Sequence, residues 1–200
     1  MKTPTSRRQD GFTLVELLVV IAIIAVLAGA GFAAGNAAIQ KAKKTTALAT
    51  CTALESAVSN FYTEYGSMPT TSVGNGTTDD PPIKTKSDLE TLKVLLGLTE
   101  TTNPPLNGRA VKFLSVREGK GNKNGLMYNA SGSTVTGLFD PWGGSYYLAM
   151  DTNYDEKVEA QPAGATAAKK LNGRRAAAWS NGADGAGTAT GKIGDDVITW

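Results

Sequence analysis

An uninterrupted apolar stretch near the start of the chain constrains its fold more than any other feature. From Leu17 to Ala34 the sequence reads LLVVIAIIAVLAGAGFAA, without a single charge. As an α-helix rising ~1.5 Å per residue, this stretch spans roughly 27 Å, enough to cross the hydrocarbon core of a bilayer. A core helix of a soluble domain shows a polar face, and this stretch has none. The sequence therefore predicts a membrane-spanning helix.

Composition excludes several classes of function. The 200 residues contain no histidine and one cysteine, Cys51, which excludes histidine-dependent triads, an intrachain disulfide and multi-cysteine metal sites. Lys and Arg number 20 against 18 Asp and Glu, a balance too even to indicate a nucleic-acid-binding surface. The sequence also lacks a nucleophile elbow and a phosphate-binding loop, so we do not expect an enzyme.

A basic segment precedes the apolar stretch, and a carboxylate stands at its edge. The basic start is typical of a secretory signal peptide, but the apolar stretch is longer than the usual ~7–15 residues. Glu16 directly precedes Leu17, and a carboxylate at membrane depth costs roughly 2.5–3.5 kcal/mol. Either the helix start frays and Glu16 reaches the interface, or Glu16 has a specific cation to meet.

Residues 11–21, GFTLVELLVVI, closely resemble the cleavage and methylation signature of type IV pilins and type II secretion pseudopilins. The resemblance implies that a prepilin peptidase cuts between Gly11 and Phe12 and that the new Phe12 amine is N-methylated. The apolar segment is then retained. A Glu16 carboxylate from a neighbouring subunit can neutralise the Phe12 ammonium as the helices bundle into a filament, which makes two costly charges tolerable together.

Flanking charge does not decide the orientation of the span. Three basic residues precede it and three follow it, Lys41, Lys43 and Lys44, so the positive-inside count is even. The resemblance implies a cleaved leader (residues 1–11) facing the cytoplasm, a transmembrane and assembly helix (12–35) and a periplasmic pilin-like globular domain (36–200). It implies a single-pass inner-membrane protein that later joins a periplasmic filament.

The helical pattern continues beyond the span with a different character. From Ala47 to Tyr65 apolar residues recur at steps of three and four, which forms one face of an amphipathic helix. Cys51 lies on this face as a small core residue. Gly66 then supplies a stop. We expect one helix from Phe12 to Tyr65, apolar all round in its first half and packed on a globular domain in its second.

The remaining chain predicts a small sheet. Residues 66–86 are rich in Thr, Gly, Asp and Pro and are typical of a surface loop. Ser87 and Glu90 fit a capping box that opens a short helix ending at Leu96. Three strands are expected: Ala110–Val116, Tyr146–Met150 and Ala176–Trp179. The segment from Asn122 to Gly137 shows too little periodicity to assign. A long N-terminal helix packed on a small antiparallel sheet, followed by a C-terminal loop, is an α+β fold.

Residues 140–147, DPWGGSYY, carry a second resemblance, to the Asp-Pro-Trp-Gly turn that leads into the first main strand of major type II secretion pseudopilins. Pro141 fixes the entry to the turn, the glycines permit unusual φ angles, and Trp142 offers a large area to bury. We therefore expect a structural role for this motif.

Three aspartates near the C-terminus suit a hard cation such as Ca²⁺, which takes 6–8 oxygen ligands. The segment resembles the calcium loop of major pseudopilins, where a Gly-Ala-Asp-Gly turn precedes acidic residues and a terminal tryptophan. The resemblance implies that Asp184, Asp195 and Asp196 are calcium ligands, with backbone oxygens completing the shell. The alternative is a solvated acidic loop with Trp200 as a hydrophobic plug.

Two further charged motifs have ordinary explanations. Residues 151–155 alternate acids like the start of an EF-hand, but Glu156 and Pro162 stand where that loop needs glycine and glutamate, so we expect a turn between strands. Lys169, Lys170, Arg174 and Arg175 form a basic cluster of the kind that a DNA-uptake pilin uses to bind phosphates. Because Asn172–Gly173 reads as a turn within the cluster, we expect instead a solvated loop, and nucleic acid is not an expected partner.

The resemblance implies a structural subunit of a type II secretion pseudopilus, whose filament aids protein export. The implied partners are further copies of the chain, minor pseudopilins, the prepilin peptidase, the inner-membrane secretion assembly platform and, before assembly, the membrane. The alternative is a subunit of a type IV pilus or a DNA-uptake pilin. Many such pilins close their C-terminal region with a disulfide, which Cys51 alone does not allow.

Overall fold

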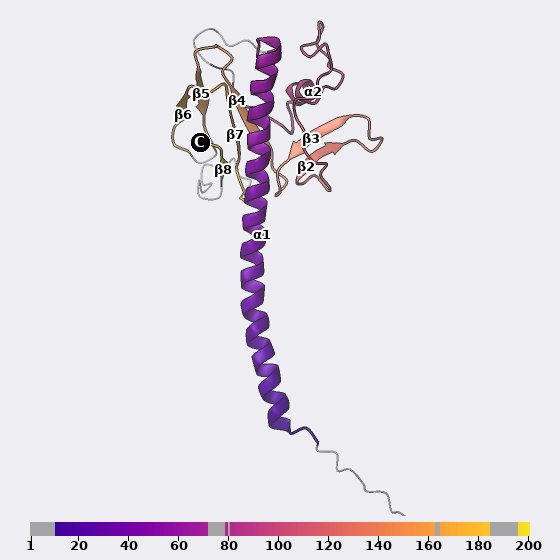
Figure 1. Cartoon of the computed structure of the whole chain (residues 1–200), viewed down its shortest axis with the longest axis vertical. Helices are drawn as coiled ribbons and strands as arrows, with labels where there is room; N and C mark the ends of the chain where they lie inside the picture. The colour runs from indigo at the N-terminus through magenta and orange to yellow at the C-terminus, as the bar shows by residue number, and fades with distance from the viewer. Residues whose placement is uncertain (1–10, 72–78, 80, 163–164, 185–195) are drawn as a thin grey trace, which may run out of the picture. The chain divides into compact units, whose positions relative to one another are not determined.

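The computed structural model of the chain describes residues 11–71, 79, 81–162, 165–184 and 196–200. A boundary between Ala42 and Lys43 divides it into two compact units. Helix α1, Leu14–Tyr65, has 52 residues and contributes to both units (Figure 1). It begins two residues after the expected start and ends where expected, because Gly66 adopts a left-handed conformation with φ 70°.

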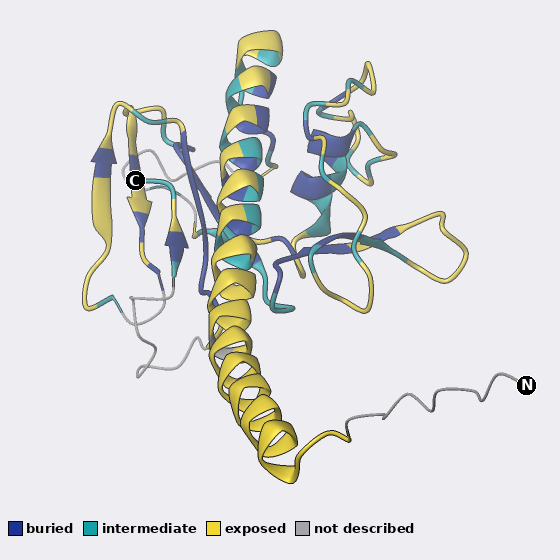
Figure 2. Cartoon of the chain, turned by 60° about the horizontal axis from the view of Figure 1, so that its bottom comes forward, coloured by how far each residue is buried: buried dark blue, intermediate teal, exposed yellow. Residues whose placement is uncertain are grey.

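In the first unit, α1 exposes its apolar side chains. Leu27 is 65% exposed and Phe32 75% exposed, and Figure 2 shows the described residues of this part of the helix as exposed. This part of α1 contains a stretch long and apolar enough to cross a membrane, and none of that stretch is buried within the chain.

In the second unit, α1 contributes one face to a closed core. The side chains of Ala47, Cys51, Leu54, Val58 and Phe61 are fully buried. They share this core with an antiparallel sheet of four strands in the order β1-β4-β7-β8. Its strands are β1 (Ile83–Lys84), β4 (Tyr146–Met150), β7 (Ala176–Ser180) and β8 (Val197–Ile198). The α+β fold expected from the sequence is therefore confirmed.

Side chains alternate between the two faces of this sheet, as strand geometry requires. Leu148 and Ala178 face the core that includes α1, whereas Ala149, Ala177 and Trp179 belong to a second, smaller core. A hairpin of β5 (Lys157–Ala160) and β6 (Lys169–Asn172) covers that second core with Val158 and Leu171.

A further hairpin and a short helix complete the unit. Helix α2, Leu89–Leu96, contacts strand β3, Val135–Phe139, which pairs with β2, Gly125–Tyr128. This hairpin occupies much of the segment that the sequence pattern left unassigned. The sequence does not predict this hairpin, because its turn and flanks are mostly Gly, Ser, Thr and Asn.

Two of the three expected strands are confirmed, as β4 and β7, and the third is wrong. Ala110–Val116 contains no strand. Its backbone instead follows the end of α2, where the N–H groups of Phe113 and Leu114 donate to the Leu95 carbonyl at 2.9 and 2.8 Å. The apolar side chains that suggested a strand fill the core, since Leu114 is fully buried.

The start of α2 also differs from the expected capping box. The helix begins at Leu89, with Asp88 rather than Ser87 at the cap position, and the Asp88 side chain does not cap the helix. Its carboxylate instead accepts a hydrogen bond from the Lys84 N–H at 2.6 Å. Glu90 accepts hydrogen bonds from Lys93 and from the backbone after the helix, so it does not reach back to the helix start.

Candidate functional site

The residues at the expected processing point lie directly ahead of α1. Gly11 and Phe12 have no regular secondary structure, and Phe12 is 81% exposed. No atom of the described residues lies within 4 Å of the position that a side chain on Gly11 would occupy. An exposed peptide bond outside a helix is the kind of backbone that a peptidase can bind in an extended form.

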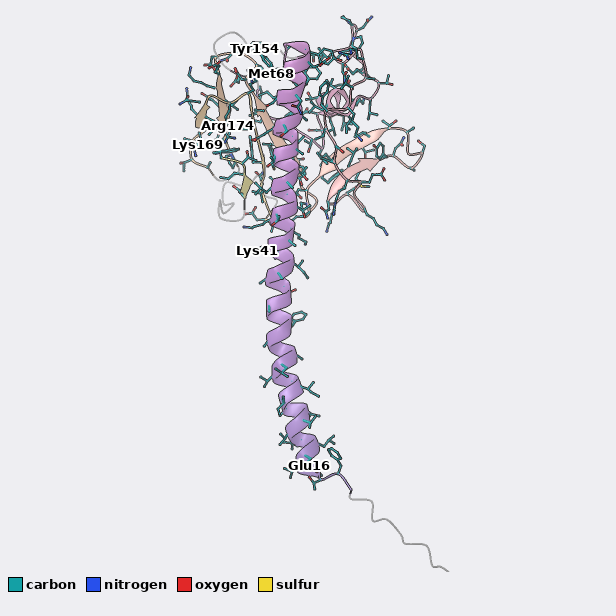
Figure 3. The ribbon with its side chains drawn as sticks, viewed as in Figure 1. Glu16, Lys41, Met68, Tyr154, Lys169 and Arg174 are labelled. Carbon is teal, nitrogen blue, oxygen red and sulfur yellow. The ribbon has the colours of Figure 1, made fainter. Side chains whose placement is uncertain are left out.

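Glu16 and Thr13 form a reciprocal cap at the start of α1. The Glu16 carboxylate accepts hydrogen bonds from the Thr13 N–H at 2.8 Å and the Thr13 hydroxyl at 2.7 Å, and the Glu16 N–H donates to that hydroxyl at 3.2 Å. This is the geometry of a capping box, in which two otherwise unpaired backbone donors are satisfied (Figure 3 labels Glu16).

The sequence interpretation missed this cap, although its signal was present. Thr13-Leu-Val-Glu16 fits the pattern of Ser or Thr followed three residues later by Glu or Gln, immediately before an apolar run. The carboxylate therefore has a partner within its own subunit. Capping needs only a hydrogen-bond acceptor, whereas neutralising an ammonium needs a negative charge, so the two roles of Glu16 can be separated by mutation.

Asp140 organises the turn that leads into β4. Its buried carboxylate accepts hydrogen bonds from the N–H groups of Trp142, Gly143 and Gly144 at 2.7 to 2.9 Å. Its other oxygen accepts a hydrogen bond from the Ser180 hydroxyl at 2.7 Å. The expected structural role of this turn is confirmed, because one side chain fixes the turn and links it to the end of β7.

The described C-terminal residues are fastened to α1 and to the sheet. Glu55 of α1 accepts hydrogen bonds from the Ala178 N–H at 3.0 Å and from the Thr199 hydroxyl. The ring of Trp200 lies edge-on to Trp179, with centroids 5.7 Å apart. These contacts agree with the alternative of Trp200 as a hydrophobic plug, and Asp196 directly precedes β8, an edge strand of the sheet.

The expected calcium ligands are only partly described. Asp184 is exposed and Asp196 is half-buried, whereas Asp195 lies outside the described residues. Among the residues that the structure describes, no three acidic, cysteine or histidine side chains gather in a way that would hold a metal ion. Calcium binding at this loop therefore stays a prediction.

The acidic segment that resembled an EF-hand start forms a turn between β4 and β5. The Asp151 carboxylate accepts hydrogen bonds from the N–H groups of Asp155 and Glu156, both at 3.0 Å. Asp79 accepts another from Thr152 at 3.0 Å, and its partial burial raises the pKa of its carboxyl. The Tyr154 hydroxyl accepts a hydrogen bond from the Met68 N–H at 3.2 Å (Figure 3). The expected turn is confirmed.

The basic cluster is built into the fold of the second unit. Lys169 and Lys170 lie on β6, so the expected loop is wrong at these residues, because their backbone pairs with β5. The Asn172–Gly173 turn is confirmed, with Gly173 at φ 68° (Figure 3 labels Lys169 and Arg174). Three of the four cations contact neighbouring side chains: Lys170 pairs with Glu159 at 2.9 Å, Arg174 lies 3.6 Å from Glu55, and Arg175 stacks 4.4 Å from the Tyr62 ring centroid.

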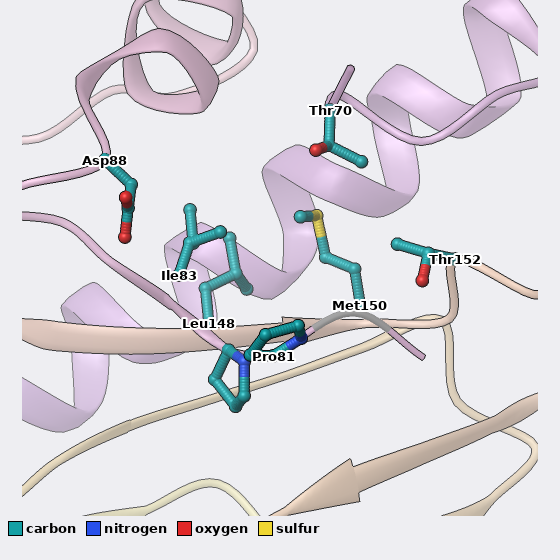
Figure 4. A pocket seen from close by; sticks show the side chains of 8 residues that line it. Thr70, Pro81, Ile83, Asp88, Leu148, Met150 and Thr152 are labelled. Carbon is teal, nitrogen blue, oxygen red and sulfur yellow. The ribbon is translucent and has the colours of Figure 1, made fainter. Parts of the chain in front are cut away.

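A buried cysteine and a cavity lie apart from these motifs. Cys51 is fully buried, as expected for a core residue, and burial raises the pKa of its thiol, which disfavours the reactive thiolate. A cavity of about 290 Å³ lies beside β1 and the end of β4 (Figure 4). Its lining is mostly proline, aliphatic and threonine side chains, and its one carboxylate, Asp88, accepts the backbone hydrogen bond from Lys84.

Comparison with known proteins agrees with the helix start described above. Residues 6–32 match the model of the prokaryotic N-terminal methylation motif. No solved structure matches the chain.

Similar proteins extend the match into the second unit. A fimbrial protein of Neisseria meningitidis is 31% identical over 116 residues, which is 55% of this chain and 68% of that protein. The type IV major pilin protein PilE of Neisseria gonorrhoeae is 29% identical over 138 residues, 64% of this chain and 82% of the pilin. The prepilin peptidase-dependent protein D of Escherichia coli is 34% identical over 120 residues, 60% of this chain and 79% of that protein. The chain belongs to the type IV pilin-like family.

Proposed function

We propose that the chain is a structural subunit of a membrane-derived filament and that it polymerises through the apolar half of α1. The observation that carries the proposal is the start of α1, where an exposed Gly11–Phe12 bond precedes a capped carboxylate and a long unburied apolar helix. Pilin-like proteins are processed by a prepilin peptidase and assemble into filaments, which fits these features.

The proposed mechanism of assembly begins with cleavage after Gly11, which creates an ammonium at Phe12. This charge is costly in or near lipid unless an anion neutralises it. Glu16 of an adjacent subunit supplies that anion, and the exposed apolar side chains of neighbouring helices then pack against one another. In the separate subunit, Thr13 holds the same carboxylate. On assembly, the Glu16 carboxylate therefore gains the Phe12 ammonium of a neighbouring subunit as a partner, in place of or in addition to Thr13 of its own chain.

The proposed location rests on the same helix and, for its orientation, on the resemblance of the helix start to that of pilins and pseudopilins. Residues 1–11 form a cytoplasmic leader, residues 12–35 span the inner membrane, and residues 36–200 contribute a periplasmic domain. The subunit rests in the membrane before assembly and meets the prepilin peptidase there. The filament contains further copies of the chain together with minor subunits, and its growth depends on an inner-membrane assembly platform.

Within this class we propose a type II secretion pseudopilus as the filament. The Asp140 turn and the acidic C-terminal segment that ends in Trp200 support this assignment, as does the single buried cysteine. A type IV pilus is the second candidate, and it is favoured by the similarity to pilins of Neisseria. A strain lacking the chain separates the two: loss of exported protein without loss of surface pili supports the first, and the reverse supports the second.

We also propose that the C-terminal loop binds calcium through Asp184, Asp195 and Asp196. A ligand that binds only the folded chain at about 100 times its Kd adds roughly 2.7 kcal/mol to the free energy of unfolding. Thermal melting with calcium and with a chelator should therefore show a higher midpoint with calcium. Asp184→Asn should reduce that shift, and Glu118→Gln, an exposed acid elsewhere, should not. Identical midpoints with calcium and with chelator would refute the proposal.

Mass spectrometry of the mature N-terminus tests processing. In cells that contain a prepilin peptidase, the chain should lose residues 1–11 and gain one methyl group on Phe12. Glu16→Ala should be processed in the same way but should yield few filaments. An intact leader in peptidase-containing cells would contradict the proposed processing, and normal filaments from Glu16→Ala would contradict the proposed role of its charge.

A further inference from the structure

The loop before β2 carries exposed positive charge that neighbouring carboxylates do not pair. Arg117, Lys120 and Lys123 are exposed, and the only acid among them in the sequence is Glu118. None of the three cations forms an ion pair with a carboxylate in the part of the chain that the structure describes. We call residues 117–124 the basic loop.

Backbone contacts hold the basic loop in a defined conformation. The Arg117 guanidinium donates to the Asn124 carbonyl at 2.8 Å, and the Asn124 N–H donates to the Asp140 carbonyl at 2.7 Å. Gly125, at φ 144°, allows the two ends of the loop to approach, because a side chain there would collide with the Arg117 carbonyl. A loop that is ordered before binding loses little conformational entropy when it meets a partner.

The basic loop lies at the end of the second unit where α1 enters it. Tyr146, at the start of β4, lies close enough to Thr50 of α1 and to Arg117 for both to act on its hydroxyl. Lys123 packs on the Asp140 turn, since a side-chain carbon on Gly143 would lie 3.4 Å from its Cγ. Thr50 is seven residues after the first residue of the unit, roughly 11 Å along an α-helix.

The chain reaches this end of the unit directly from the apolar segment. Lys43 follows Ile39 by four residues, roughly 6 Å along the helix. With a span that ends at residue 35, the polar headgroup layer, which adds roughly 5–7 Å to each side of the hydrocarbon core, covers about the next four or five residues and ends just before Lys41. Electrostatic attraction reaches about 8 Å further at physiological ionic strength. The entry end of the unit is therefore the part that connectivity brings nearest the lipid.

We propose that the basic loop, with Lys43, binds the headgroup phosphates of anionic phospholipids at the surface of the membrane that α1 spans. The inference rests on the proposed membrane anchoring of α1 and adds to it a second contact, made by the globular domain. Such a contact fixes the orientation of the domain before assembly and has to break when the subunit leaves the membrane. Residues 117–124 contain no aromatic side chain on which a base could stack, which favours a lipid surface over a nucleic-acid strand.

Hydrogen–deuterium exchange of the full chain in lipid nanodiscs tests this inference. One set of nanodiscs contains phosphatidylcholine alone, and the other contains a roughly 3:1 mixture of phosphatidylcholine and phosphatidylglycerol. One lysine near an anionic surface changes an equilibrium constant about fivefold, so exchange in residues 117–125 should slow at least fivefold in the anionic nanodiscs. Lys120→Gln/Lys123→Gln should abolish the difference, whereas Lys112→Gln/Lys169→Gln, with the same charge change at exposed positions outside the loop, should keep it.

Protection of residues 14–39 separates the inference from the proposed function. If these residues exchange freely in both nanodiscs, membrane anchoring fails and the lipid contact fails with it. If they are protected in both but the basic loop exchanges equally fast with neutral and anionic lipid, the inference alone is overturned. Protection of the loop by duplex DNA in neutral nanodiscs, but not by anionic lipid, would also overturn it and assign the loop to nucleic acid.

Discussion

The two parts of α1 form one helix but depend on different surroundings. Leu27 in the first part is 65% exposed, whereas Leu54 in the second part is fully buried. Among the residues that the structure describes, nothing in its own unit covers the apolar surface of the first part, and the proposed function assigns this surface to lipid and to neighbouring subunits. The second part has its partner in the sheet and α2. The comparison teaches that both parts form the same helix but that different partners bury their apolar side chains.

Truncation of a leucine should give the largest contrast between the two parts. Leu54→Ala leaves a cavity in the core and should lower the free energy of unfolding of the Lys43–Trp200 unit by about 2–5 kcal/mol. Leu27→Ala, the matched change in the exposed part, should alter it by less than about 0.5 kcal/mol. Chemical denaturation of both variants measures the difference, and equal losses would show that the two parts are not energetically separate.

Removal of one Asp140 oxygen should give the next largest effect. Asp140→Asn keeps the shape of the side chain but replaces one of the two acceptor oxygens that serve three N–H groups and the Ser180 hydroxyl. The free energy of unfolding should fall by roughly 1–3 kcal/mol. The readout is the same denaturation curve, with Asp184→Asn in the absence of calcium as an exposed control. A stability equal to that of the control would contradict the role assigned to the turn.

Alkaline pH should destabilise the second unit. Burial raises the pKa of Tyr146 and of Cys51 above their ordinary values of about 10 and about 8.5. Both groups stay protonated in the folded chain but ionise when it unfolds, so their contribution is complete below those ordinary values and is lost as pH rises above them. Above its ordinary pKa, each group then lowers the free energy of unfolding by about 1.4 kcal/mol per pH unit.

The variant Tyr146→Phe isolates one of these two contributions. The fall in unfolding free energy above pH 10 should become shallower in this variant, while Tyr128→Phe, in the β2–β3 hairpin, should keep the original slope. Unfolding titrations with denaturant at a series of pH values provide the measurement. An unchanged slope in Tyr146→Phe would show that this phenol ionises as readily in the folded chain as in the unfolded one.

Exposed ion pairs should contribute least to the stability of the chain. The Glu159–Lys170 pair on the β5–β6 hairpin measures 2.9 Å, but both side chains are at least half exposed. Solvent screening and side-chain entropy offset most of such an attraction. Lys170→Ala should therefore leave the melting midpoint of the chain unchanged, and a clear drop would mean that this hairpin controls the stability of the second core.

Periodic signals predicted much of the fold. The uncharged run and the three-four spacing after it placed α1 to within two residues at its start, and segments with aromatic residues between turn residues located β4 and β7. The strand expected at Ala110–Val116 was wrong because local composition does not reveal whether a neighbouring strand is available. The β2–β3 hairpin was missed because tertiary packing, rather than its own polar residues, stabilises it.

The site was predicted unevenly. The sequence predicted that Glu16 needs a cation as partner but not its bonds to Thr13, because these bonds satisfy unpaired backbone donors at the helix start and not a charge. The expected basic cluster on β6 is largely occupied by partners within the chain, whereas the basic loop before β2 escaped notice. Its charges are few, and only the folded structure places them beside the entry of α1.

Filament assembly by two variants at the helix start tests the central claim most directly. Glu16→Gln retains an acceptor that can cap the helix but loses the charge, and Thr13→Val removes the capping hydroxyl but keeps the charge. After confirmation of cleavage by mass spectrometry, filaments are counted by electron microscopy at equal subunit levels. The account predicts that Glu16→Gln assembles poorly and that Thr13→Val assembles well. Normal filaments from Glu16→Gln together with failure of Thr13→Val would contradict it and would make the cap, rather than the charge, the requirement for assembly.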